Sequence, residues 1–104
     1  MGIKNFDYAI KDLLMVIELS PKATFAYSKI ADIYKMNNNF EQAKSFYTKA
    51  IEINPKYASA YFGLAEIYER NKQIDLAVEK YKEAAKLDVK LAKECNIKIA
   101  ELNN

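Results

Sequence analysis

The strongest constraint on the fold is that this sequence resembles itself at an offset of 34 residues. Residues 24–57 and 58–91 are identical at ten of 34 positions, where ordinary amino-acid usage gives roughly one match in 15. Residues 5–23 match the second half of the same unit, residues 39–57. The repeats therefore predict one domain over residues 1–104, divided into a half repeat (1–23), two full repeats (24–57 and 58–91) and a last helix (92–104).

Each full repeat has the pattern of two helices. Apolar residues recur at the i, i+3, i+4, i+7 spacing of one helical face in the first half of each unit, as in Tyr27, Ile30, Ala31 and Tyr34. A second stripe follows after Asn37–Asn39, and Asn tolerates the left-handed backbone that ends helices. The small residues Ala31 and Ala65 are expected to face Ala43 and Ala77 across each helix pair. We expect an all-α fold of about six helices.

Composition agrees with this fold class and argues against an enzyme. Two Gly and two Pro in 104 residues are too few for the frequent turns of an all-β domain. The chain has no His, one Cys and two isolated Gly, so it lacks the usual acid–base residue, a Cys- or His-based metal site and a phosphate-binding loop. We therefore predict no catalytic residue, no metal and no cofactor.

The pattern of aromatic and small residues resembles the tetratricopeptide repeat. Tyr27-x-x-Ile30-Ala31-x-x-Tyr34 begins the first full unit, and Tyr61-x-x-Leu64-Ala65-x-x-Tyr68 begins the second. Two departures are Ala where the family usually has Gly, and Val89 in place of the closing Pro. The resemblance implies a right-handed superhelix of antiparallel helix pairs and a non-catalytic scaffold that binds a peptide or helix of a partner protein.

In such a superhelix, the first helix of each pair lines the concave side, and residues off the packing stripe face a ligand. The groove candidates are Phe25, Ser28, Asp32, Lys35, Ser59, Phe62, Glu66 and Glu69. Phe25 and Phe62 are either anchors for an apolar ligand or packing residues. The acidic members suit a ligand with a basic or apolar stretch.

The best-known peptide site of the family is a clamp that holds the C-terminal carboxylate of chaperones. Its positions fall on Ser28, Asp32, Gly63, Lys93 and Ile97, of which only Lys93 keeps the basic type. Starting one half repeat earlier, the positions would be Lys29, Ser59 and Gly63. Asp32 would repel a carboxylate, so the sequence predicts no such clamp.

The first helix offers a competing hypothesis. Its run Leu13–Ile17 is apolar throughout, whereas the positions equivalent to Leu14 and Met15 are polar in both full repeats. These two residues and Ile10 are either tolerated surface residues or contacts to another helix, to a second copy or to a partner. The alternative function is therefore self-assembly through the first helix.

The last helix and the charge complete the expectations. Leu91, Cys95, Ile99 and Leu102 form one apolar stripe, which is typical of a capping helix with Cys95 buried. The net charge of +2 is too balanced to indicate a nucleic-acid or membrane-surface partner. Without an apolar run that resembles a signal peptide or membrane span, the default expectation is a cytoplasmic protein.

Overall fold

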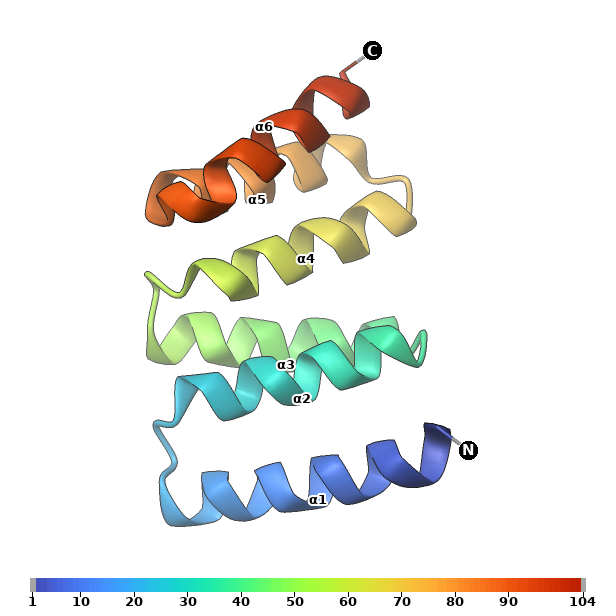
Figure 1. Cartoon of the computed structure of the whole chain (residues 1–104), viewed down its shortest axis with the longest axis vertical. Coiled ribbons are helices and arrows are strands. Elements are labelled where there is room, and N and C mark those ends of the chain that lie inside the picture. Colours follow the sequence, from blue (N-terminus) through green and yellow to red (C-terminus); the bar gives the residue numbers. More distant parts are fainter. Residues whose placement is uncertain (1, 104) are drawn as a thin grey trace. The chain divides into compact units, whose positions relative to one another are not determined.

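The computed structural model describes residues 2–103, and their side chains from Phe6 onward. Met1 and Asn104, the outer ends of the expected half repeat and capping helix, lie outside the described residues. The described residues form six α-helices in chain order (Figure 1): α1 (Gly2–Leu19), α2 (Thr24–Met36), α3 (Phe40–Ile53), α4 (Ala58–Arg70), α5 (Ile74–Leu87) and α6 (Val89–Leu102). The all-α prediction is confirmed.

The helices divide into two compact units, Met1–Pro55 and Lys56–Asn104. In the first unit, α2 packs against both α1 and α3. In the second unit, α5 packs against both α4 and α6. Each unit therefore contains a complete antiparallel helix pair with one additional helix on it.

The corners within the two pairs have the same backbone geometry. Asn38 and Lys72 both have positive φ, 65° and 62°. The N–H of Asn39 donates to the Tyr34 carbonyl at 2.8 Å, and the N–H of Gln73 donates to the Tyr68 carbonyl at 2.9 Å. These bonds satisfy carbonyls at the helix end in a Schellman motif. Lys72 adopts this backbone although Lys favours it less than Asn does.

Small residues bring the paired helices close together, as the sequence predicted. Ala31, Ala43, Ala65 and Ala77 are all 0% exposed. In the second unit, Ala65, Ala77, Tyr81, Ala84 and Cys95 form one buried cluster. Burial of Cys95 is therefore confirmed. A larger side chain at these alanines would force the helix axes apart.

The last helix begins three residues earlier than expected, at Val89 rather than residue 92. The Asp88 side chain accepts a hydrogen bond from the backbone N–H of Lys90 at 2.9 Å. This capping bond satisfies a donor that the first turn leaves unpaired, so the helix can start directly after α5 ends.

Candidate functional site

On α2, an exposed aromatic ring and a carboxylate lie on the same side of the helix. The Phe25 side chain is 50% exposed, although it is large and apolar. Asp32 follows seven residues later, which is nearly two helical turns. The Tyr47 hydroxyl donates a hydrogen bond to Asp32 Oδ1, and Lys35 Nζ lies 5.9 Å from the centroid of the Tyr47 ring. Tyr47 of α3 thus positions both charged groups on α2.

Ser28, the remaining candidate on α2, is only 3% exposed. A ligand on this side of α2 would not reach the Ser28 hydroxyl without displacing its neighbours. The surface of α2 available to a ligand is therefore made by Phe25, Asp32 and Lys35.

On α4, Ser59 is exposed, whereas the second aromatic candidate packs inward. The Phe62 ring meets the Tyr81 ring edge-on, with 5.4 Å between centroids and 76° between planes. Phe62 also packs against the buried cluster of the second unit. Edge-to-face contact is a favourable arrangement for aromatic rings, so most of the Phe62 ring stabilises the helix pair.

The repeat register explains why the two aromatic candidates differ. At the offset of 34 residues, Phe25 aligns with Ser59, and Phe62 aligns with Ser28. The first position is exposed in both units, and the second is turned toward the helix pair in both. This distinction could have been found in the sequence by comparing the two phenylalanines position by position.

Glu66 and Glu69 stand together on α4, and the structure adds two cations that sequence reasoning missed. A cavity of about 210 Å³ is lined by Glu66, Glu69, Arg70 and Lys98. Arg70 ends α4, and Lys98 comes from α6. The repeat pattern of the sequence contains no signal that Lys98 lines a cavity with these residues of α4.

Tyr81 holds one of these carboxylates. Its hydroxyl donates to Glu69 Oε1 at 2.7 Å, and its side chain is 0% exposed. Burial, followed by the hydrogen bond to Glu69 and the charges of Glu69 and Glu66, raises the Tyr81 pKa far above its ordinary value. The hydroxyl therefore remains a donor at any physiological pH.

Three core tyrosines place their hydroxyl groups on acceptors within the protein. The hydroxyls of Tyr47 and Tyr81 donate to Asp32 and Glu69, and that of Tyr27 donates to the Pro21 carbonyl at 3.1 Å. A buried hydroxyl needs an acceptor inside the protein, because water cannot reach it.

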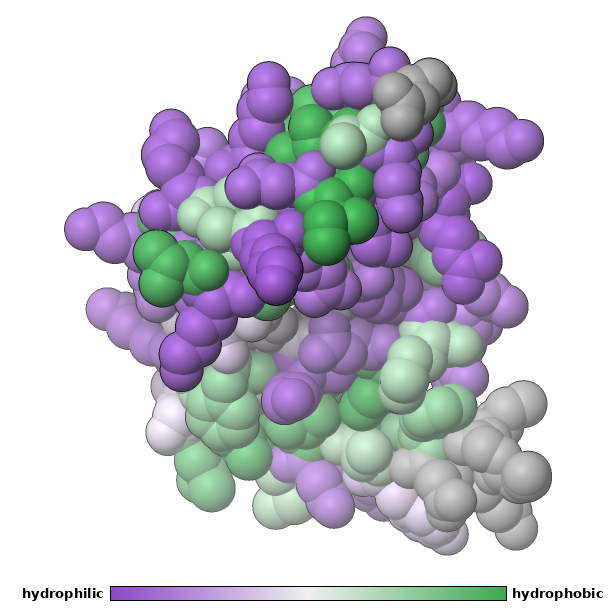
Figure 2. All heavy atoms as spheres, turned by 45° about the horizontal axis from the view of Figure 1, so that its top comes forward, coloured by the Kyte–Doolittle hydropathy of each residue, from purple (hydrophilic) through white to green (hydrophobic). Residues whose placement is uncertain are grey.

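The outer side of α1 exposes several large apolar side chains. Leu14 is 45% and Met15 57% exposed, and Tyr8 and Leu19 on the same helix are 65% and 82% exposed. Hydrophobic side chains gather over the part of the molecule that α1 and α2 form (Figure 2). Ile10 lies elsewhere: it is half-buried and lines a cavity of about 300 Å³ with Asp7, Tyr34, Asn37 and Asn39.

The described residues offer neither a metal-binding cluster nor a membrane-spanning helix. They contain no group of three or more His, Cys, Asp or Glu side chains that could hold a metal ion. None of the six helices is long and apolar enough to cross a membrane.

Two family models match the sequence. Both are described as tetratricopeptide repeat, one over residues 24–57 and the other over residues 46–79. The chain therefore belongs to the tetratricopeptide repeat family, whose domains are usually non-catalytic modules that bind other proteins. A comparison with curated proteins found no match.

Solved structures share the fold over nearly the whole chain. The first TPR of Spaghetti (RPAP3) bound to the HSP90 peptide SRMEEVD has a TM-score of 0.86 at 18% identity, covering 96% of this chain and 79% of that one. The TPR2B domain of yeast Sti1 in complex with pHsp70 has a TM-score of 0.85 at 23% identity, covering 96% and 84%. MamA has a TM-score of 0.76 at 31% identity, and the match covers 88% of this chain but only 53% of MamA.

Two of these neighbours carry chaperone peptides, so the comparisons do not support the sequence-based exclusion of a carboxylate clamp. At 18% and 23% identity, the likeness shows the fold alone. The absence of a clamp therefore stays a prediction.

Proposed function

We propose that this domain is a non-catalytic scaffold that binds a peptide or helix of a partner protein on the exposed side of α2, and that the exposed side of α4 is a separate candidate surface in its own unit. The observation that carries the proposal is Phe25, a large apolar side chain that is 50% exposed on the same side of α2 as Asp32. Exposed aromatic side chains are frequent anchors in protein interfaces. On α4, Ser59, Glu66 and Glu69 would contact a ligand, and Phe62 would support them from beneath.

The charges indicate the chemistry of the ligand. Asp32 and Glu69 each accept a hydrogen bond from a buried tyrosine, so their carboxylates are held in place before a ligand arrives. Glu66 lies beside Glu69 in the same cavity. A peptide with an apolar residue for Phe25 and a basic residue for Asp32 would match the surface of α2, and a basic residue would match the Glu66 and Glu69 carboxylates of α4.

The test is selection of peptide ligands from a random displayed library, followed by calorimetric titration of the selected peptides. Phe25→Ala should weaken binding by at least about tenfold, the size expected for an interface anchor. Val89→Ala is a matched control, because Val89 is an apolar residue that is 84% exposed on α6. Peptides that bind Phe25→Ala as well as the parent, but lose affinity for Val89→Ala, would place the ligand elsewhere.

The proposed ligand is not a chaperone C-terminus. Among the clamp positions counted from the first full repeat, Ser28 and Gly63 are buried and Asp32 is a carboxylate, so Lys93 would be their one cation for a terminal carboxylate. Titration with the peptide SRMEEVD should show no saturable binding up to about 1 mM. A micromolar dissociation constant that rises on Lys93→Ala substitution would overturn this part of the proposal and establish a clamp.

A second candidate function is self-association, which the exposure of Leu14 and Met15 on α1 favours. Sedimentation velocity over a concentration series should then show the mass rising toward that of a larger assembly. Leu14→Lys should shift the distribution to monomer, and Thr48→Lys, at the equivalent position of α3, should leave it unchanged. A parent chain that stays monomeric at millimolar concentration would exclude this function.

A further inference from the structure

The exposed side of α1 combines apolar residues with three charged ones, Asp7, Lys11 and Glu18. Lys11 and Glu18 are both exposed and seven residues apart, so they lie on one line along the helix, about 10 Å from each other. Leu14 and Met15 lie between them in sequence, one on each flank of that line, and are 45% and 57% exposed. An apolar centre is thus bounded by a cation toward one end and an anion toward the other.

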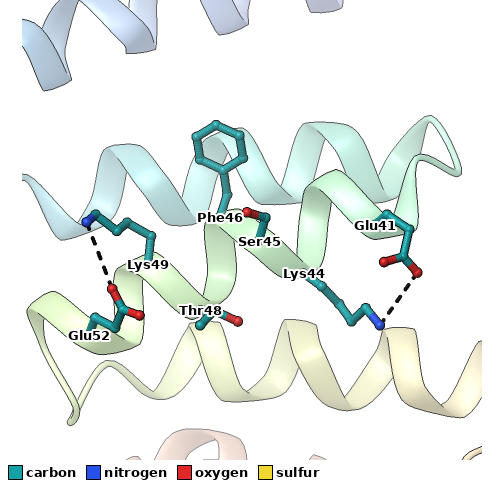
Figure 3. Close-up of a pocket in the computed structure, with 7 residues that line it drawn as sticks. All are labelled: Glu41, Lys44, Ser45, Phe46, Thr48, Lys49 and Glu52. Atoms are coloured by element: carbon teal, nitrogen blue, oxygen red, sulfur yellow. Dashed lines mark ion pairs between the residues drawn. The ribbon is translucent and has the colours of Figure 1, made fainter.

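The equivalent face of α3 has a different chemistry. At the offset of 34 residues, Lys11, Leu14, Met15 and Glu18 align with Ser45, Thr48, Lys49 and Glu52. In Figure 3 these α3 residues border a cavity of about 540 Å³, and Lys49 pairs with Glu52 at 3.9 Å on the same helix. The Phe46 ring of α3 points instead toward α2, 5.7 Å from the Tyr34 ring. The apolar outer face is therefore a property of α1 and not of the repeat.

We propose that two copies of this chain associate through the outer face of α1 in an antiparallel, twofold-symmetric arrangement that places Lys11 of one copy against Glu18 of the other. The proposal rests on the self-association function and specifies its geometry. A twofold axis between Leu14 and Met15, perpendicular to α1, makes each of these residues face its own copy. The same axis brings the Tyr8 and Leu19 side chains, both exposed on one flank, next to each other across the interface.

Charge complementarity selects this arrangement over the parallel one. In a parallel pair, Lys11 would face Lys11 and Glu18 would face Glu18, so both contacts would be repulsive. In the antiparallel pair, both contacts join opposite charges.

Charge also argues against a helix that continues the repeat array on α1. In the first full repeat, Phe46 of α3 lies against Tyr27 of α2. In the second, Lys80 of α5 lies against Tyr61 of α4. The equivalent residue of α1 is Asp12, which is exposed. A carboxylate against the face of an aromatic ring is unfavourable, so a helix with the repeat's tyrosine would be disfavoured there. A second copy packed on the outer face of α1 would leave Asp12 at the rim of the interface.

The test is charge exchange, measured by sedimentation velocity over a concentration series. Lys11→Glu and Glu18→Lys should each weaken the dimer by at least about tenfold, because each turns two attractive contacts into repulsive ones. The double variant K11E/E18K should restore the parent dissociation constant to within about threefold. Glu52→Lys is the matched control on α3 and should leave the constant unchanged.

The outcomes separate the two proposals. A parent chain that is monomeric at every concentration overturns self-association and this geometry with it. If Leu14→Lys disrupts the dimer but neither single charge reversal weakens it, only the antiparallel pairing is overturned. Recovery in the double variant, with helical circular dichroism unchanged in all variants, supports the pairing.

Discussion

Tyr47 and Tyr81 occupy equivalent repeat positions, yet their hydroxyls reach acceptors at different positions. Tyr47 donates to Asp32, which aligns with Glu66, whereas Tyr81 donates to Glu69, which aligns with Lys35. The lysine at position 35 cannot accept, so only the earlier carboxylate is available to Tyr47. The difference between Lys35 and Glu69 therefore changes which carboxylate accepts the hydrogen bond from the tyrosine hydroxyl.

Tyr81→Phe removes a hydrogen bond without changing the ring. The donor is buried and the acceptor is a half-buried carboxylate, so the free energy of unfolding should fall by about 1–2 kcal/mol. Urea denaturation measures this difference. The control Tyr8→Phe concerns a tyrosine that is 65% exposed and should change stability by less than about 0.5 kcal/mol. Equal losses in both variants would mean that the Glu69 contact contributes nothing.

Lys72 offers the opposite prediction, a stabilising substitution. Its φ of 62° is costly for a residue with a Cβ, and glycine adopts it freely. Lys72→Gly should raise the free energy of unfolding by about 0.5–1 kcal/mol in urea denaturation. Asn38→Gly at the equivalent corner should gain less, because Asn already tolerates this backbone. Destabilisation by Lys72→Gly would indicate that the lysine side chain contributes more than its backbone costs.

Alkaline pH should destabilise the fold, because Cys95 and Tyr81 keep their protons to a higher pH in the folded chain than in the unfolded chain. Burial, with smaller contributions from Glu94 and Asp88, raises the pKa of Cys95 above its ordinary 9.0, and burial raises the pKa of Tyr81. As pH rises, the unfolded chain loses these protons before the folded chain does. The resulting stabilisation is complete below the ordinary pKa values of the two groups and is lost as pH rises through their pKa values in the folded chain. The melting temperature should fall between about pH 8.5 and about pH 10.5, and less steeply in the Cys95→Ala/Tyr81→Phe variant. An identical slope in that variant would contradict this origin.

At the scale of elements, the helices follow local sequence signals, and their boundaries depend on caps. The apolar stripes placed α2 to α5 within a residue or so, because a stripe at helical spacing buries one face whatever its partner is. The start of α6 differs from the expected residue 92, because that expectation followed the 34-residue repeat register and not the helix cap. The cap at Asp88 was the deciding signal.

Asp88→Ala tests that cap. The substitution removes the 2.9 Å bond to the Lys90 N–H and should lower the free energy of unfolding by about 1 kcal/mol. Asp88→Asn keeps an acceptor of the same shape and should remain within about 0.5 kcal/mol of the parent. Both are measured by urea denaturation. A loss of unfolding free energy in Asp88→Asn as large as that in Asp88→Ala would assign the effect to the charge of Asp88 rather than to capping.

At the scale of the whole molecule, burial is unevenly distributed between the helices. Six residues of α4 are buried, whereas α1 has none among the residues described from Phe6 onward. Helices with few buried contacts open locally before the global transition.

Hydrogen exchange should therefore be fastest in α1. At low protein concentration, mass spectrometry should find the amides of α1 exchanging well before those of α4 and α5. Protection of α1 that rises with concentration, while α4 and α5 are unchanged, would accompany self-association through α1. Equal protection of α1 and α4 at low concentration would contradict the uneven distribution of stability.

The sequence by itself determined the helix pairs, the corner at Asn38, the small residues between paired helices and the burial of Cys95. Each of these follows from periodicity or from backbone preference, which act within a few residues. Tertiary structure alone decided which carboxylate each tyrosine holds, and that Lys98 of α6 lines a cavity with Glu66 and Glu69. These are contacts between elements, and they depend on how side chains of one helix fit against another, which no local pattern records.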